Sequence, residues 1–180
     1  MSTLSVGLGS APHVAGNDKR PAPLVDGIAP PTQFRPTVLA LDLEATLISS
    51  AVSQFPRPGL RNFLERCREL FGRIVMFTTV PEDRFRRIAQ VLVEEGAAPD
   101  WFQELEYVTW TGRTKDLSFI PNCCVEHALL VDDLSEYVHP GQQSQWVPAD
   151  PFEPPFDVND EGLAKVLTNL QARVSSWSNL

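Results

Sequence analysis

The chain has 180 residues, and its 23 acidic against 15 basic side chains give a formal net charge of −8. Its hydrophobic fraction of 43% is ordinary for a globular protein and argues against wholesale disorder. No stripe of Lys and Arg stands out in the sequence, so we do not expect nucleic acid as a partner.

The sequence has no feature typical of a membrane or secreted protein. No apolar run approaches the roughly 20 residues that a helix needs to span a bilayer, and the N-terminus lacks the basic and apolar regions of a signal peptide. The three cysteines, Cys67, Cys123 and Cys124, show no CxxC or Cys/His spacing typical of zinc sites. We therefore predict reduced thiols in a cytoplasmic protein with no membrane partner.

The chain divides by composition near residue 35. Residues 1–35 are rich in Pro, Gly, Ser and Ala and show no helical or strand periodicity, which predicts a flexible tail. Residues 36–180 should form one domain. It begins with TVLALDL (residues 37–43), a nearly continuous apolar run typical of a strand buried on both faces of a parallel sheet.

The middle of the chain predicts alternating helices and strands. Apolar side chains at helical spacing indicate a helix over residues 58–72, and RIVMFTT (residues 73–79) is a second buried strand. A second helix over residues 81–96 has acidic side chains in its first turn. Two short extended pieces, within residues 105–117, should form a hairpin-like pair around a Thr-Gly turn.

The C-terminal part completes the expected sheet. HALLVDD (residues 127–133) is a third buried strand, QWVP (residues 145–148) is a short strand, and a last helix should run over residues 159–177. Alternating strands and helices are typical of a parallel α/β sheet with right-handed crossovers. We predict a Rossmann-like three-layer α/β fold with a central, mainly parallel sheet.

Acidic side chains and a hydroxyl stand where the predicted strands end. Asp42 and Glu44 end the first strand, Thr78 the second, and Asp132 with Asp133 the third. Because binding sites in such sheets form outside the carboxyl ends of the strands, these side chains should meet in one crevice. Several acids there repel one another and need a cation, and hard oxygen ligands with open positions favour Mg²⁺.

This combination of groups supports phosphoryl transfer. With Asp132 and Asp133 as metal ligands, Asp42 can attack phosphorus and form an aspartyl-phosphate. A neighbouring acid can protonate the leaving oxygen and later activate water. Thr78 and Lys115 would hold the phosphoryl oxygens as negative charge spreads over them.

The segments around these residues resemble the motifs of the haloacid dehalogenase superfamily of aspartyl phosphotransferases. DLEATL (residues 42–47) resembles the Asp-x-Asp-x-Thr motif, and VMFTT, TKDL and LLVDDL resemble the second, third and fourth motifs. The closer resemblance is to the NLI-interacting-factor-like branch, small phosphatases related to those acting on the RNA polymerase II tail. That branch also carries a Tyr-x-x-His-Pro-like stretch, here YVHP (residues 137–140).

The resemblance implies a role for each residue. Asp42 would be the nucleophile and a metal ligand, Thr78 and Lys115 would bind the phosphoryl group, and Asp132 and Asp133 would complete the Mg²⁺ site. Residues 36–180 would form the phosphatase domain, and the reaction would be hydrolysis of a phosphoric monoester.

Glu44 departs from the family pattern, which usually has a second Asp at this position. Its backbone carbonyl would still bind Mg²⁺, and its side chain would serve in acid–base catalysis. The extra methylene moves the carboxylate by about 1 Å, and misplacement of that size can cost around 100-fold in rate. A pseudophosphatase that retains only phosphate binding is therefore an alternative, and Glu44→Asp would discriminate between the two.

The spacing of the motifs leaves no room for a cap domain. A loop and one helix separate Asp42 from Thr78, and one helix and the hairpin-like pair separate Thr78 from Lys115. An open site suits a phosphorylated side chain of a protein, and the resemblance implies phosphoserine or phosphothreonine. A phosphatase of small metabolites with an open site is the third possibility, and the sequence does not predict the oligomeric state.

Overall fold

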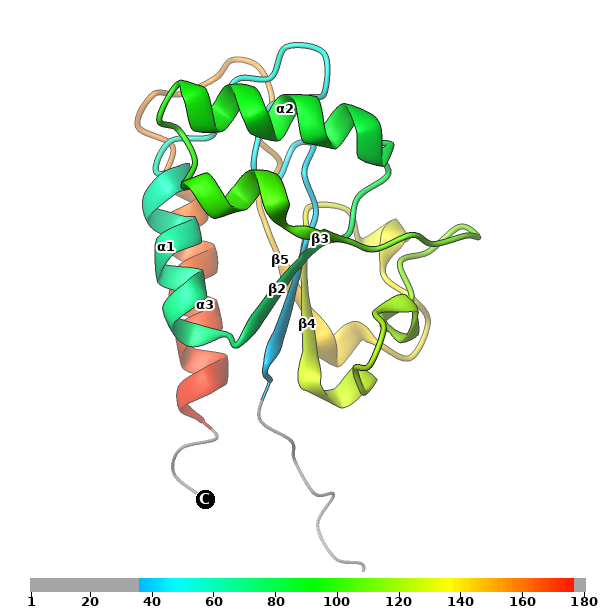
Figure 1. Ribbon diagram of the computed structural model, residues 1–180. Helices are drawn as coiled ribbons and strands as arrows, with labels where there is room; N and C mark the ends of the chain where they lie inside the picture. Colours follow the sequence, from blue (N-terminus) through cyan, green and yellow to red (C-terminus); the bar gives the residue numbers. More distant parts are fainter. Residues whose placement is uncertain (1–35, 177–180) are drawn as a thin grey trace, which may run out of the picture. The chain divides into compact units, whose positions relative to one another are not determined.

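The computed structural model describes residues 36–176, and the predicted tail lies outside the described residues (Figure 1). Five strands form one sheet in the order β3-β2-β1-β4-β5, and every neighbouring pair is parallel. The strands are β1 (Val38–Leu41), β2 (Arg73–Met76), β3 (Glu106–Tyr107), β4 (Ala128–Asp132) and β5 (Trp146–Pro148). The predicted parallel α/β sheet is therefore confirmed.

The two central strands explain the apolar runs in the sequence. All residues of β1 and β4 are buried, because side chains on both faces of the sheet are covered. Their register aligns Leu39 with Ile74 of β2 on one side and with Leu129 of β4 on the other. These aligned residues point to the same face and form part of the larger hydrophobic cluster.

One face of the sheet is covered by α-helices. They are α1 (Leu60–Leu70), α2 (Glu82–Glu94) and α3 (Gly162–Ser175), and each contributes buried side chains to the same hydrophobic cluster as Leu39 and Leu41. In Figure 1, α1 and α3 lie side by side on this face. The amphipathic periodicity that predicts the helices therefore also identifies the surface they bury.

The opposite face is covered by a layer without α-helices. Val108, Leu117 and Ile120 pack against the side chains of Ala40 and Phe77, which project to this face. Much of the layer is irregular chain with short 3-10 turns. The 3-10 turns Leu117–Phe119 and Val125–His127 contribute to this layer, whereas Asp100–Glu104 packs with the helices on the other face. The remaining 3-10 turns of the described residues are Ser135–Tyr137 and Gln143–Gln145. The predicted third layer is present, but it consists of loops and turns.

The predicted hairpin-like pair within residues 105–117 is wrong. β3 extends the sheet in parallel with β2, and Val108 N–H donates to the carbonyl of Met76 at 2.9 Å. Further along, Lys115 forms a parallel bridge with Val138, and its N–H donates to the carbonyl of Tyr137 at 2.7 Å. The two extended pieces therefore do not pair with each other: the first pairs with β2, and the second pairs at Lys115 with the loop that contains Val138.

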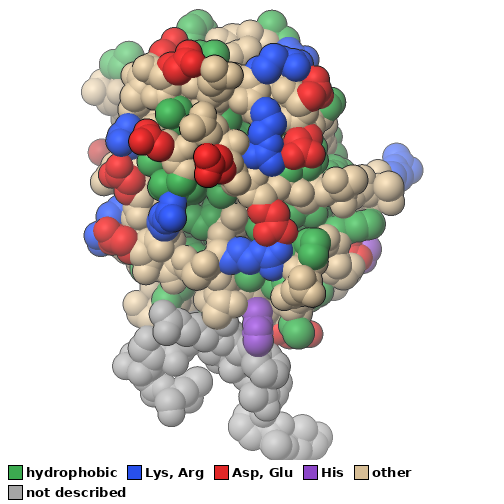
Figure 2. Space-filling model, in the orientation of Figure 1, with side chains coloured by type: hydrophobic (Ala, Val, Ile, Leu, Met, Phe, Trp, Pro, Cys, Tyr) green, Lys and Arg blue, Asp and Glu red, His purple; other side chains and the backbone are tan. Residues whose placement is uncertain are grey.

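The surface carries mixed charge. Figure 2 shows basic and acidic side chains interspersed on the face that it presents. On α2, Arg86 pairs with Glu82 at 2.8 Å and Arg87 pairs with Asp83 at 2.9 Å, one helical turn apart. The helices within residues 36–176 are also too short or too polar to cross a bilayer.

Candidate active site

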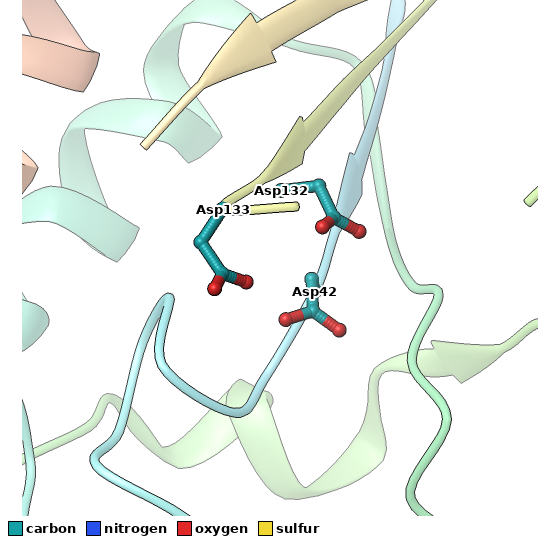
Figure 3. A group of neighbouring side chains, drawn as sticks. All are labelled: Asp42, Asp132 and Asp133. Carbon is teal, nitrogen blue, oxygen red and sulfur yellow. The ribbon is translucent and has the colours of Figure 1, made fainter. Parts of the chain in front are cut away.

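Three carboxylates meet at the carboxyl edge of the central strands. Asp42 follows β1, Asp132 is the last residue of β4, and Asp133 comes next (Figure 3). Since β1 and β4 are adjacent and parallel, their ends coincide, and Asp42 N–H donates to the carbonyl of Val131 at 3.0 Å. Oxygens of the three carboxylates lie within 4.8 Å of one another. The topology thus brings together acids that are far apart in the sequence.

Lys115 neutralises part of this charge. Its Nζ donates to Oδ1 of Asp42 at 2.6 Å and to Oδ2 of Asp132, and its side chain is fully buried. Burial would lower the pKa of Lys115, but the charges of Asp42 and Asp132 and their hydrogen bonds outweigh it, so the pKa is raised. The lysine is therefore a fixed cation in contact with two of the three acids.

The acids still carry more charge than Lys115 balances. Burial, and then the charge of Asp42, raise the pKa of Asp132, although Lys115 opposes this effect. The pKa of Asp133 is raised by the same two causes. Asp42 and Asp132 are buried and Asp133 is half-buried, and carboxylates that repel one another in this way provide the hard oxygen ligands that Mg²⁺ prefers. The donor set of Asp42, Asp132 and Asp133 therefore fits this ion.

Thr46 joins the first and last of these acids. Its hydroxyl is fully buried and lies 3.1 Å from Oδ2 of Asp42 and 3.3 Å from Oδ1 of Asp133. The chain turns sharply to bring it there, because Ala45 adopts a left-handed conformation with φ 54°. The motif Thr is thus part of the polar network of the site.

Glu44 lies beside the acidic group and contacts a different segment. Its Oε1 accepts a hydrogen bond of 2.6 Å from the N–H of Ala51, in the loop that leads to α1. The residue is half-buried, and its carboxylate is not among those that cluster with Asp42. The side chain is thus engaged with the loop on the rim of the site.

Thr78 lies two residues after β2, the neighbour of β1. Phe77 N–H donates to the carbonyl of Leu41 at 2.8 Å, which keeps the two strand ends level. Thr78 is fully buried, and its Oγ1 accepts from Val80 N–H at 3.3 Å, whereas Thr79 is exposed. A pocket of about 350 Å³ opens beside these two threonines. Its other lining residues are Tyr107, Thr109, Trp110 and Gly112.

Two tryptophans support the backbone of the site. The indole N–H of Trp110 donates to the carbonyl of Thr78, and that of Trp146 donates to the carbonyl of Asp132, both at 2.9 Å. Trp110 also packs edge-on against Phe77, with ring centroids 5.7 Å apart. The sequence suggests no role for these residues beyond packing, because a hydrogen bond to a distant carbonyl leaves no periodic pattern.

Comparisons with known proteins agree with this architecture. The sequence model of the NLI interacting factor-like phosphatase family matches residues 37–179. Among solved structures, the chain is similar to Fcp1, described as an essential RNA polymerase II CTD phosphatase, with a TM-score of 0.50 and 15% identity. That alignment covers 78% of this chain and 50% of the other. At this identity the similarity shows the fold alone.

A second structure resembles the chain in the same way. It is a variant of the fission yeast RNA polymerase II CTD phosphatase Fcp1 bound to beryllium fluoride, with a TM-score of 0.48 and 15% identity. The alignment covers 78% of this chain and 52% of that one, so the chain spans about half the length of the structures it matches. No curated protein matches the sequence.

Proposed function

The chain belongs to the NLI interacting factor-like phosphatase family, and from this premise we propose that it hydrolyses phosphomonoesters with Asp42 as the nucleophile. The observation that carries the proposal is the environment of the Asp42 carboxylate. One of its oxygens contacts the buried ammonium of Lys115, and the other accepts from the hydroxyl of Thr46. Such contacts fix the orientation of a carboxylate that must meet phosphorus in line.

The reaction has two steps. A carboxylate oxygen of Asp42 attacks phosphorus, the bond from phosphorus to the ester oxygen breaks, and an acid protonates the departing alcohol. Water then attacks the aspartyl-phosphate, which releases inorganic phosphate and restores the carboxylate of Asp42. Glu44 is our candidate for the acid and for the base of the second step. To serve there, its carboxylate must leave the N–H of Ala51.

Two groups would hold the phosphoryl oxygens. Lys115 is already charged and buried beside Asp42, so it can stabilise the charge that develops in the transition state without reorganising. Thr78 stands at the end of the adjacent strand and would donate its hydroxyl. Thr78 follows β2 of the sheet, and Lys115 is bridged to Val138 in the loop layer.

Mg²⁺ is the proposed cofactor. Asp42, Asp132 and Asp133 would hold it, together with the backbone carbonyl of Glu44. When bound, the ion supplies positive charge that offsets the repulsion between substrate phosphate and the acids. Burial and the charge of Asp42 raise the pKa values of Asp132 and Asp133, and a bound cation would oppose both effects.

We assign the substrate to the class of proteins that carry phosphoserine or phosphothreonine. In the described chain, a loop and α1 separate β1 from β2, and α2 with β3 separates β2 from Lys115, so no inserted domain encloses the site. The pocket beside Thr78 and Thr79 leaves space for residues that flank a phosphorylated side chain. The first solved structure named above is described as an RNA polymerase II CTD phosphatase, and a protein substrate of this chain would agree with that description.

The test is a phosphatase assay on wild type and Asp42→Asn, with Mg²⁺ and with a chelator. We expect turnover of an aryl phosphate and of phosphoserine peptides that needs Mg²⁺ and disappears in Asp42→Asn, which keeps the shape of the side chain. Asp83→Asn, in an exposed ion pair of α2, serves as the matched control and should behave as wild type. Turnover that persists in Asp42→Asn would contradict the proposed nucleophile.

The same assay separates the alternatives. A pseudophosphatase would bind phosphopeptide and show no Mg²⁺-dependent turnover. A small-metabolite phosphatase would turn over sugar or nucleotide phosphates with a higher kcat/KM than phosphopeptides. The pseudophosphatase alternative rests on Glu44, the one departure from the family motif. The small-metabolite alternative rests on the open site.

A further inference from the structure

Arg57 is a charged side chain with no access to solvent. The side chain is 0% exposed, and Arg57 lies just before α1, at the end of the loop that leads there from Asp42. Its Nε and Nη2 form a fork with the carboxylate of Asp160 at 2.6 and 3.1 Å. Its Nη1 donates to the carbonyls of Asp150 at 2.8 Å and Thr46 at 3.2 Å. A buried guanidinium with this many charged and polar partners is held in a single orientation.

The partners of Arg57 belong to two segments that the fold brings together. Asp150 and Asp160 lie in the connection between β5 and α3, whereas Thr46 lies in the loop after β1. The same two segments meet again next to Thr46, because Phe152 N–H donates to the carbonyl of Ala45 at 2.7 Å. The ring of Phe152 also packs on the guanidinium, and Cζ of Arg57 lies 5.4 Å from the ring centroid.

These contacts hold a strained turn. Ala45 has a φ of 54°, a conformation that non-glycine residues adopt only where the surrounding structure enforces it. The next residue, Thr46, must place its hydroxyl between Asp42 and Asp133. Arg57 and Phe152 fix the carbonyls of these two consecutive residues, so they determine the geometry of the turn.

We propose that Arg57 and Asp160 form a clamp that positions Thr46, and through it the carboxylates of Asp42 and Asp133. The clamp consists of the Arg57–Asp160 fork and the bonds from Arg57 to the carbonyls of Thr46 and Asp150. Arg57 touches neither Asp42 nor Asp133 and is a positioning residue. The assignment rests on the proposed function only in giving Asp42 the role of nucleophile.

Gly162 offers a way to disturb the clamp without changing its charges. A Cβ added at Gly162, the first residue of α3, would stand 1.9 Å from Nη2 and 2.4 Å from Cζ of Arg57. The guanidinium cannot move aside easily, since it is fully buried and hydrogen-bonded through Nε, Nη1 and Nη2. Gly162→Ala should therefore displace the guanidinium and with it the carbonyl of Thr46.

Three variants probe the clamp. Arg57→Lys keeps the charge but loses the fork, Asp160→Asn keeps the shape but loses the charge, and Gly162→Ala keeps both partners. Matched controls come from the pair Arg73–Glu106. Arg73 is the first residue of β2, at the end of the strand away from Thr78, and it forms a similar fork with Glu106 and a hydrogen bond to the carbonyl of Pro121. The controls are Arg73→Lys, Glu106→Gln and Gly72→Ala, whose Cβ would meet only the carbonyl of Thr37 at 3.9 Å.

Two readouts distinguish positioning from a merely structural role. The first is the split between kcat and KM for an aryl phosphate. The second needs no turnover and is the rise in Tm that Mg²⁺ causes in each variant. We expect the clamp variants to lose about 10–100-fold in kcat or in Mg²⁺ affinity, with a smaller change in KM. The three controls should retain both properties even where their own Tm falls.

A double-mutant cycle with Thr46→Val tests the route through Thr46. Because the clamp acts by placing the Thr46 hydroxyl, Asp160→Asn should cost much less kcat in the Thr46→Val background than in wild type. Equal costs in the two backgrounds would overturn the route. The proposal would also fail if Asp160→Asn and Gly162→Ala lowered Tm but left kcat and the Mg²⁺ effect as in wild type.

The same measurements distinguish failure of the clamp from failure of the proposed phosphatase activity. If wild type binds Mg²⁺ but turns over no phosphate ester, and the clamp variants lose the Mg²⁺ effect, the clamp stands and the phosphatase activity fails. If wild type turns over esters and the clamp variants match it, the activity stands and the clamp fails. Absence of both Mg²⁺ binding and turnover in wild type would overturn both.

Discussion

The carboxylate of Glu44 accepts a hydrogen bond of 2.6 Å from the N–H of Ala51. Glu44 therefore holds the loop that leads from Asp42 to α1. A carboxylate needs no proton for this contact, but a general acid does. The two tasks can be separated by substitution, because a carboxamide can accept the hydrogen bond and cannot deliver a proton.

Glu44→Gln should leave stability almost unchanged and reduce catalysis. The free energy of unfolding should stay within about 0.5 kcal/mol of wild type, since the contact with Ala51 is kept. Turnover of a phosphoserine peptide should fall by about 10²–10⁴-fold, the usual contribution of general acid–base catalysis. The kcat/KM for an aryl phosphate should fall less than that for the peptide, because this ratio reports the first step only and an aryl leaving group needs little protonation. An equal fall in kcat/KM for both substrates would argue against Glu44 as the acid.

Glu44→Asp shortens the side chain and should affect both tasks. Ala51 is buried, and leaving its N–H without a partner costs about 1–3 kcal/mol. Urea denaturation should show a loss of stability in that range. Since Glu44 is the acid in our proposal, turnover should fall as well. An increase in turnover would support the alternative that Glu44 has lost its catalytic role.

Lys115→Met should strongly destabilise the protein in the absence of Mg²⁺. The substitution leaves the carboxylates of Asp42 and Asp132 buried beside each other without their cation, and breaking a buried pair in this way costs about 3–5 kcal/mol. Mg²⁺ should restore part of the loss by replacing the missing charge. Denaturation with and without Mg²⁺ measures both effects.

The control for Lys115→Met is Lys165→Met. Lys165 pairs with Asp150 at 3.4 Å, and both side chains are more than half exposed, at 67% and 73%. Exposed pairs of this kind contribute about 0–1 kcal/mol. A similar loss of stability in both variants would mean that the buried network around Lys115 has no special energetic role.

The sequence predicts the central strands and the helices because burial on both faces leaves apolar runs and burial on one face leaves helical periodicity. The runs over Val38–Leu41 and Ala128–Asp132 are examples. The hairpin-like pair predicted within residues 105–117 is wrong. Short extended pieces around a Thr-Gly turn suit a hairpin locally, but β3 forms its hydrogen bonds with β2 instead, and Lys115 pairs with the loop at Val138. Local turn chemistry does not reveal such competition.

The position of the acids can be predicted from the sequence because they follow apolar strands, and Lys115 is a candidate because TKDL resembles a family motif. Arg57, Trp110 and Trp146 cannot be predicted, since each acts on a backbone carbonyl of a site residue, 11, 32 and 14 positions away. A carbonyl is present at every residue, so the partner has no signature in the sequence. Arg57 stands just before a predicted helix, and an arginine in such a position is usually exposed, so the sequence does not indicate its burial.

Trp110→Phe and Trp146→Phe should weaken the site more than the fold. Each substitution keeps most of the apolar ring and removes one hydrogen bond to a site carbonyl, worth about 0.5–1.5 kcal/mol of stability. We expect Trp110→Phe to raise KM, because it loosens Thr78, and Trp146→Phe to raise the Mg²⁺ requirement, because it loosens Asp132. Steady-state kinetics at several Mg²⁺ concentrations measures both.

Trp101→Phe is the control for the two tryptophan variants. Trp101 packs under the guanidinium of Arg68 at 4.9 Å, away from the acids and on the side of the sheet that α1 covers. It should alter neither KM nor the Mg²⁺ requirement. If all three substitutions had the same kinetic effect, the indole N–H groups would have no specific role in the site.

The Arg57–Asp160 pair should make stability depend on pH in a defined direction. Hydrogen bonds from Arg57 lower the pKa of Asp160, and burial opposes them only in part. A carboxyl with a lowered folded-state pKa stabilises the protein fully above its unfolded-state pKa, and the stabilisation disappears as the pH falls through the folded-state value. The window therefore starts at the ordinary value of 3.8 and extends below it.

Comparison of wild type with Asp160→Asn isolates this contribution. The difference in the free energy of unfolding should be largest at neutral pH. It should shrink as the pH falls through that window, because Asp160 is then protonated and is as uncharged as the carboxamide of the variant.

Asp83→Asn, which removes an exposed carboxylate from α2, is the control and should show a small difference at every pH. Chemical denaturation at a series of pH values gives both curves. A difference between wild type and Asp160→Asn that stays constant, or grows on acidification, would contradict the ion pair as the source of the stabilisation.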